Sequence, residues 1–119
     1  PGYADDGWNK SPFVIYLKAH KNIIKPGIPI YSDANEGVYL CTGLSSKLLP
    51  HRYFKNKVQQ FYNLKRYYVV WFDSLYNPEL IGIHDILMKK NLEKIGADSG
   101  GEIYYYDEGI LTEDQKKYY

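Results

Sequence analysis

The sequence predicts a small, mostly β domain that contains one inserted helix. The chain has 119 residues, which is the usual size of a single domain. Hydrophobic residues make up 45% of it and charged residues 24%, as in ordinary globular proteins. Short stretches rich in β-branched and aromatic residues alternate with turn-forming residues, a pattern that is typical of small barrels.

The first 24 residues predict an N-terminal arm and one extra strand. Residues 1–12 mix Gly, Asp, Asn and Pro without periodicity, which is typical of an arm. Residues 13–19 are apolar and mostly aromatic or β-branched, which favours a strand. Lys25-Pro26-Gly27 then predicts a turn, because Pro presets one turn dihedral and Gly accepts a positive φ. The main domain is therefore expected to span residues 25–90.

The next two strands are expected at residues 28–31 and 38–44. Pro29 places the first of them at an edge, or at the beginning of the strand, since proline cannot donate a ladder hydrogen bond. Residues 32–37 are dense in turn formers. The two strands therefore form a plausible hairpin.

A basic insertion of residues 45–66 follows, and it favours a helix. Pro50 stands just before the stretch in which apolar residues recur at helical spacing. The residues with that spacing are Tyr53, Phe54, Val58, Phe61, Tyr62 and Lys65.

Residues 67–73 form the strongest predicted strand. Alternation places Tyr67, Val69 and Trp71 on one face. Tyr68, Val70 and Phe72 then lie on the other face. Because both faces are apolar, we expect this strand at the centre of the sheet.

The remaining elements are shorter. Residues 74–78 predict a turn, residues 80–83 a strand, and residues 84–88 a helical turn that could extend to residue 95. Residues 97–101 predict a loop, 103–106 a last strand, and Thr112 a cap that opens a terminal helix. The segment 91–119 thus adds strands around the barrel or forms half of a second one.

The net charge of +1 hides a strong division of charge along the chain. No acidic residue occurs between Glu36 and Asp73. A basic face of this kind can bind a polyanion, although it can equally be a solvated surface. The basic residues of this stretch are Lys47, Arg52, Lys55, Lys57, Lys65 and Arg66.

Two segments resemble a known family. Residues 27–33, followed by Gly37-Val38-Tyr39, are similar to the opening hairpin of a Tudor domain. Residues 69–76, followed by residues 81–87, resemble the third and fourth Tudor strands, with Ser74 where the family has a second acid. The chain is most similar to the Tudor domains of DNA-damage checkpoint mediators and of histone-methylation readers. The resemblance implies an SH3-like barrel, with the helical insertion between strands two and three.

The resemblance also implies a function. It predicts a non-catalytic, nuclear chromatin-binding module that is monomeric and carries no cofactor. Such a module would bind a methylated histone peptide in an aromatic pocket, because aromatic faces attract a methylated cation. It would bind double-stranded DNA through the basic insertion. The pocket carried over to this chain is Tyr31, Tyr39, Phe72, Asp73 and Tyr76.

The tyrosine-rich composition also fits a second class of function. A small protein-interaction or inhibitory module, of the microbial or viral antagonist type, would use the fourteen tyrosines as contact surface and would be cytoplasmic. Catalysis is not expected, because Cys41 lies in an apolar stretch and the neighbours His84 and Asp85 would point apart on a strand. No metal-binding cluster is predicted. No apolar run approaches the roughly 18 residues of a membrane helix.

Overall fold

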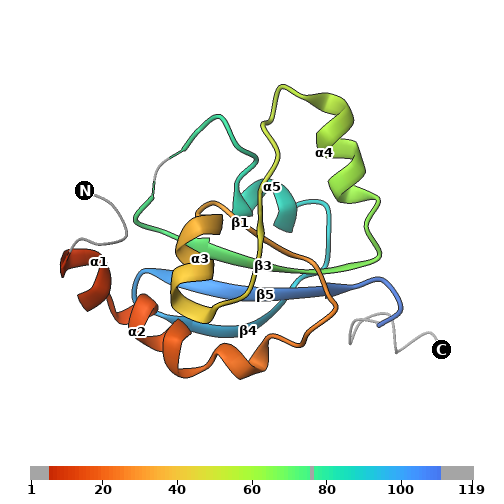
Figure 1. Cartoon of the computed structure of the whole chain (residues 1–119). Coiled ribbons are helices and arrows are strands. Elements are labelled where there is room, and N and C mark those ends of the chain that lie inside the picture. The colour runs from red at the N-terminus through yellow and green to blue at the C-terminus, as the bar shows by residue number, and fades with distance from the viewer. Residues whose placement is uncertain (1–5, 76, 111–119) are drawn as a thin grey trace.

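A five-stranded mixed sheet organises the computed structural model, which describes residues 6–75 and 77–110 (Figure 1). The strand order is β2-β1-β3-β5-β4. The strands are β1 (Ile30–Ser32), β2 (Lys47–Leu48), β3 (Arg66–Phe72), β4 (Glu93–Asp98) and β5 (Gly101–Asp107). β1 runs parallel to β2 and β3, whereas β5 is antiparallel to β3 and β4.

Five α-helices and one short 3-10 helix accompany this sheet in the described residues. Two of the helices connect parallel strands: α3 joins β1 to β2, and α4 joins β2 to β3. The helices are α1 (Asp6–Lys10), α2 (Pro12–Ala19), the 3-10 helix (Lys21–Ile23), α3 (Asn35–Thr42), α4 (Lys55–Tyr62) and α5 (Ile83–Leu87).

Strand β3 lies at the centre of the sheet, which confirms the prediction for residues 67–73. It pairs with β1 on one side and β5 on the other, and the residues from Tyr67 to Val70 are all buried. Its side chains alternate between two separate cores, with Tyr68, Val70 and Phe72 in one. Tyr67 and Val69 belong to the other.

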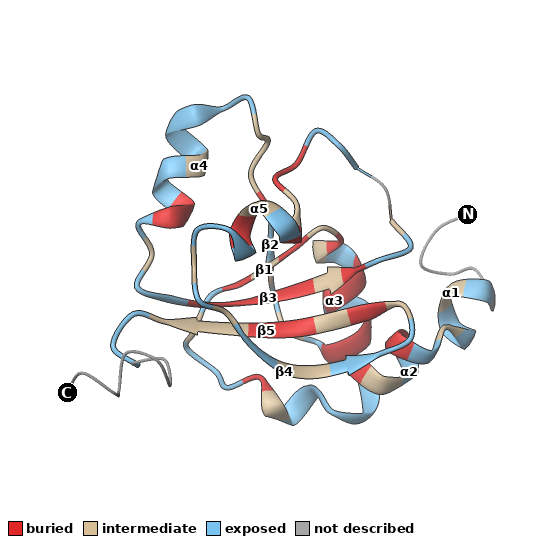
Figure 2. Ribbon diagram, turned by 180° about the vertical axis from the view of Figure 1, so that it is seen from behind, coloured by how far each residue is buried: buried red, intermediate tan, exposed pale blue. Residues whose placement is uncertain are grey.

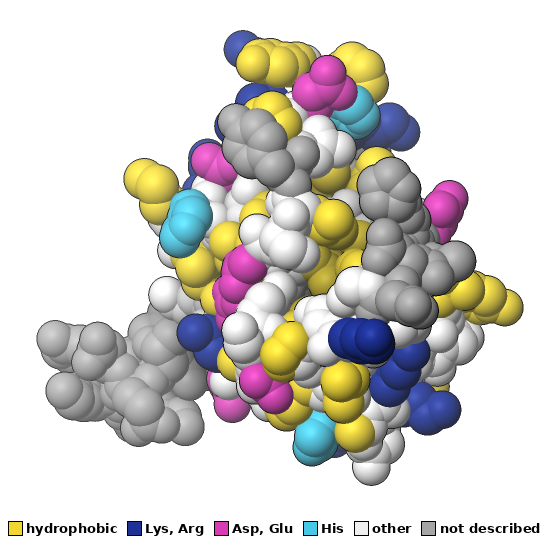
Figure 3. Space-filling model, turned by 90° about the vertical axis from the view of Figure 1, so that its left-hand side faces the viewer, with side chains coloured by type: hydrophobic (Ala, Val, Ile, Leu, Met, Phe, Trp, Pro, Cys, Tyr) yellow, Lys and Arg dark blue, Asp and Glu magenta, His cyan; other side chains and the backbone are white. Residues whose placement is uncertain are grey.

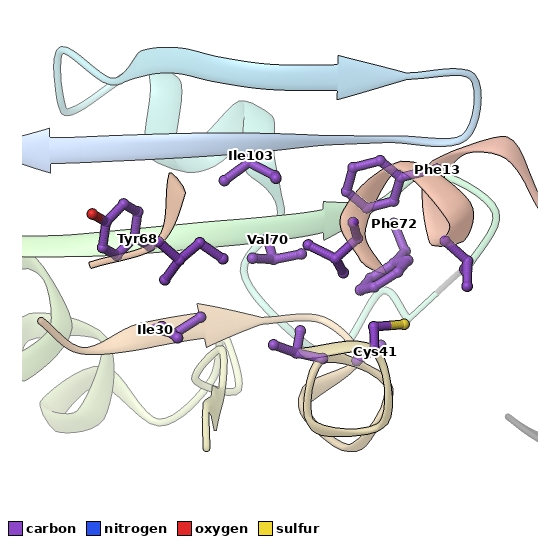
Figure 4. Close-up of a cluster of buried hydrophobic side chains, with 12 residues drawn as sticks. Phe13, Ile30, Cys41, Tyr68, Val70, Phe72 and Ile103 are labelled. Carbon is purple, nitrogen blue, oxygen red and sulfur yellow. The ribbon is translucent and has the colours of Figure 1, made fainter. Parts of the chain in front are cut away.

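The first core lies between the sheet and helices α2 and α3. Phe13 of α2 meets Phe72 of β3 edge to face, with ring centroids 5.1 Å apart (Figure 4). Val38 and Cys41 of α3 are buried in the same cluster. Gly101 of β5 allows the close approach of α2, since a Cβ there would lie 2.3 Å from the Phe13 ring.

The second core lies on the opposite face, under α4 and α5. Ile83 and Ile86 of α5 are buried in it, together with Phe61 and Tyr62 of α4. Those two aromatic residues are the last two of α4, and most of the helix is exposed (Figure 2). The prediction of a helix in the basic insertion is therefore confirmed, with the helix fixed to the sheet at its C-terminal end.

Two segments predicted as strands are helices. Residues 13–19 belong to α2, where Pro12 occupies the first turn and Phe13, Val14 and Leu17 face the core. Residues 38–42 belong to α3, with Val38, Cys41 and Thr42 buried. In both segments the buried positions are spaced by one, three or four residues, so the helical period outweighs the β-propensity of the residues.

Two predictions in the C-terminal third also fail. Residues 80–83 form no strand: Leu80 makes an isolated bridge with His51, and α5 begins at Ile83. The expected extension of a helix through residues 89–95 is wrong, because residues from Glu93 onward form β4. Gly100, with φ at +101°, allows the tight turn that pairs β4 with β5.

The sheet is open, with β2 and β4 at its two edges. The predicted SH3-like barrel is therefore not confirmed, although the chain does form a small domain built partly of strands. The expected hairpin of residues 28–31 and 38–44 is replaced by a parallel β1–α3–β2 unit. The helix expected from Thr112 lies outside the described residues. None of the helices in the described ranges has the length and apolarity of a membrane span.

Candidate nucleic-acid interface

The edge strand β2 and the start of α4 border an open groove that carries both aromatic and basic side chains. Lys47 and Leu48 of β2 are exposed, and this strand pairs only with β1. An open groove with a volume of about 500 Å³ lies between this edge and α4. Its lining combines rings, such as Tyr31 and Phe61, with the cations Lys47 and Lys57.

Helix α4 presents cations at its N-terminal end. Lys55 and Lys57 stand in its first turn, which contains no acidic residue. The positive end of a helix dipole disfavours cations by about 0.3–1 kcal/mol each. The local sequence therefore concentrates positive charge where helix stability alone would favour an acid.

Two aromatic side chains stand beside these lysines in water. Tyr53 is 77% exposed and Phe54 is 61% exposed. The Phe54 ring stacks against the His51 ring, with centroids 5.3 Å apart and planes inclined by 28°. His51 and Phe54 both line the groove. These two rings therefore remain largely exposed to solvent.

The remaining rings of the insertion are structural. Phe61 and Tyr62 are buried, and Phe61 contacts Tyr31 edge to face at 4.9 Å. Phe61 also contacts Tyr67, with a centroid distance of 4.7 Å. The hydroxyl of Tyr67 is buried without a hydrogen-bond partner, and burial is the main cause that raises its pKa.

Arg52 is occupied within the molecule. Its Nε donates to the carbonyl of Pro78 at 2.7 Å, and its Nη2 donates to the carbonyl of Leu80 at 2.8 Å. Nη2 also pairs with the carboxylate of Asp85 at 3.3 Å, and the same Asp85 oxygen accepts the N–H of Gly82. Arg52 therefore fixes the chain that leads to α5, and we leave it out of the candidate interface.

Lys65 and Arg66 lie at the opposite end of α4 and next to acidic residues. Arg66 stands in register with Asp107 of β5. The pKa of Asp107 is lowered, first by the N–H of Gly109, then by the Tyr105 hydroxyl, and in part by the charge of Arg66. The carbonyl of Lys65 accepts the N–H of Glu108. Of the six predicted cations, Lys47 and Lys57 line the groove and Lys55 stands at the start of α4, so these three form the candidate set.

Of the five residues of the predicted aromatic pocket, the four that the structure describes are not brought together. Tyr31 packs on the second core, whereas Phe72 is buried in the first core on the other face of the sheet. Tyr39 is exposed on α3 and borders a different hollow. Asp73 is exposed just after β3, and Tyr76 lies outside the described residues.

Asp33, an acidic residue that was not predicted as a site residue, lies where the parallel strands β1 and β3 end. Asp33 follows β1, and its carboxylate accepts the N–H of Phe72 at 3.0 Å. Burial is the main cause that raises the pKa of Asp33 to about 7. Burial, followed by the neighbouring Asp73 carboxyl, raises the pKa of Glu102 to about 7. The signal in the sequence was an acid directly after each of two parallel strands, but the hairpin prediction concealed it.

Catalytic and metal-binding groupings are sparse in the part of the chain described. Cys41 is buried, and burial raises the pKa of its thiol. Residues 6–75 and 77–110 hold no group of three His, Cys, Asp or Glu side chains placed to bind a metal ion.

The site is thus an open groove lined by Lys47 and Lys57, with Lys55 and the exposed rings of Tyr53 and Phe54 at the start of α4. At the top of the space-filling view (Figure 3), the end of the molecule that carries α4 in Figure 1, hydrophobic side chains lie next to Lys or Arg, His and acidic side chains. Comparisons with protein-family models, with curated proteins and with solved structures found no match to this chain.

Proposed function

We propose that the chain is a non-catalytic module that binds DNA through its basic insertion. One observation carries this proposal: Tyr53 and Phe54 remain exposed beside the acid-free lysines of α4. Exposed rings next to cations are the combination with which proteins hold nucleic acids, through phosphate contacts and through stacking. The unfavourable placement of two lysines at a helix N-terminus has a natural explanation if a bound phosphate neutralises them.

Six basic residues of the insertion are predicted to contact DNA, and the geometry favours three of them. We assign the phosphate contacts to Lys47, Lys55 and Lys57, because Arg52 is bound internally. No observation favours the predicted binding of a methylated histone peptide, because Tyr31 and Phe72 of the predicted pocket lie on opposite faces of the sheet.

The test is a fluorescence-anisotropy titration of labelled DNA at two salt concentrations. The triple variant Lys47→Ala/Lys55→Ala/Lys57→Ala should bind more weakly, and its salt slope should fall by about one for each lost phosphate contact. The control, Lys10→Ala/Lys21→Ala/Lys25→Ala, removes the same charge from exposed positions outside the insertion. Equal losses in the two variants, or no DNA binding by the unaltered chain, would contradict the proposal.

A protein-interaction module remains the second candidate, because α3 also exposes apolar area. Tyr39 and Leu40 are both more than half exposed and border a hollow of about 330 Å³ lined by Asn35, Glu36 and Ser46. Under this alternative, Tyr39→Ser/Leu40→Ser would abolish partner capture and leave the DNA titration unchanged. Under the DNA-binding proposal, the same variant is a neutral control.

A further inference from the structure

We propose that the groove between β2 and α4 holds a base of a single-stranded nucleic acid, an inference that rests on the proposed function. In a duplex, the faces of the bases are covered by their stacked neighbours. Phosphate contacts alone would give Tyr53 and Phe54 no role in duplex binding. Their exposure therefore favours a strand with accessible bases.

The size and lining of the groove fit this ligand. Its volume of about 500 Å³ lies within the range of roughly 300–1,000 Å³ that is usual for small-ligand pockets. Tyr31 and Phe61 form an aromatic wall, in edge-to-face contact with each other. Phe54 and His51 add a second pair of rings, already stacked and only partly covered. The groove thus offers apolar, flat surfaces on which any base can stack.

The charges around the groove complement a phosphate backbone. Lys47, on the edge strand, and Lys57, on α4, both line it. Lys55 stands in the first turn of the same helix. A strand that places a base against the rings would therefore place phosphates near cations from two elements. One acid also stands at this groove: the carboxylate of Glu79 lies 3.8 Å from Nδ1 of His51, which lines it.

The rings and the lysines have different roles in this site. Phe54 is the main stacking platform, Tyr53 supports a neighbouring base outside the groove, and Lys47 and Lys57 contact the flanking phosphates. Such a site is tolerant of sequence, because every base has an aromatic face. It also accepts DNA and RNA alike, since no contact in this assignment involves the sugar.

The test compares three labelled probes of equal length: oligo(dT), oligo(U) and a mixed-sequence DNA duplex. Both single strands should bind more tightly than the duplex. Phe54→Ala should weaken oligo(dT) binding about five-fold or more, which is the usual effect of losing one stacked base. Tyr39→Ala removes a similarly exposed ring from α3 and should leave the affinity unchanged.

A spectroscopic readout separates stacking from a general loss of surface. Phe54→Trp should retain affinity for oligo(dT), and its added fluorescence should be quenched on binding, beyond any change seen in the unaltered chain. If the duplex binds more tightly than oligo(dT), or if Phe54→Ala binds as well as the unaltered chain, the inference is wrong. The proposed function survives that result as long as the lysine triple variant still loses affinity. If none of the three probes binds, both proposals fall.

Discussion

Helices α3 and α4 have the same length of eight residues and flank the same short strand, yet they are attached to the sheet differently. α3 is buried at Gly37, Val38, Cys41 and Thr42, from its first turn to its last. α4 is buried only at Phe61 and Tyr62, its final two residues. α3 therefore packs on the core along its whole length, whereas α4 packs on it at one end and exposes its other end to solvent.

The ends of the two helices carry the same contrast. α3 has Glu36 in its first turn and closes at Gly43, which has a φ of +74° and donates its N–H to the carbonyl of Tyr39. These are features that stabilise a helix. α4 begins with lysines and lacks an acid in its first turn. The ends of α3 therefore favour helix stability, whereas the charges at the start of α4 oppose it.

The largest expected effect tests the anchor of α4. Phe61→Ala should lower the free energy of unfolding by about 3–5 kcal/mol, because it leaves a cavity beside Tyr31 and Tyr67. Phe54→Ala removes the same ring from an exposed site on the same segment, and it should change stability by less than about 0.5 kcal/mol. Urea unfolding followed by circular dichroism measures both values. Similar losses in the two variants would show that the start of α4 is also part of the core.

The sequence predicted the central strand and α4 correctly, for a physical reason that is visible in both. In β3, apolar residues on both faces require a strand covered from two sides, and no other element satisfies residues 67–72 equally well. In α4, the spacing of Val58, Phe61 and Tyr62 fits only a helical period. Strong, unmixed patterns of this kind do not depend on what packs against them.

The sequence misled where propensity and period disagreed. Phe13, Val14 and Ile15 favour a strand by residue type, but the adjacent Phe13 and Val14 are both buried on α2, whereas neighbours on a strand point to opposite faces. The predicted aromatic pocket depended on the predicted hairpin, in which Tyr39 stands on the second strand. Residues 35–42 form a helix instead, and Tyr39 lies on that helix. The groove could be predicted only in part, since Tyr31 and Lys47 are brought together by the parallel pairing of β1 and β2.

A smaller effect concerns the start of α3, where Asp33 links β1 to the end of β3. Its pKa is about 7 in the folded chain and 3.8 in the reference state, so the folded chain holds this proton more tightly. The stability that this proton contributes is complete below about pH 4 and is lost as the pH rises through 7. Asp33→Asn should therefore flatten the fall in stability between pH 5 and 8.

The expected size of that flattening is about 2 kcal/mol. The whole shift corresponds to about 4 kcal/mol, and part of the carboxylate stays in contact with water, which weakens the effect. Urea midpoints at pH 5 and pH 8 give the measurement. Glu102, whose pKa is raised in the same direction, leaves some pH dependence in the variant. Identical slopes for the variant and the unaltered chain would mean that Asp33 titrates as it does in water.

The smallest effect sharpens the contrast at the free end of α4. The carboxylate of Glu79 lies 3.8 Å from Nδ1 of His51, one of the rings that line the groove. Glu79→Gln should strengthen nucleic-acid binding about two-fold at low salt, because it removes one repulsion between exposed charges. The gain should vanish at high salt, where such charges are screened. Glu36→Gln, at the first turn of α3, is the matched control and should leave the affinity unchanged. Anisotropy titrations at two salt concentrations measure both variants. A gain for Glu36→Gln of the same size would mean that the bound anion senses only the net charge of the domain. A gain confined to Glu79→Gln would place the anion at the start of α4.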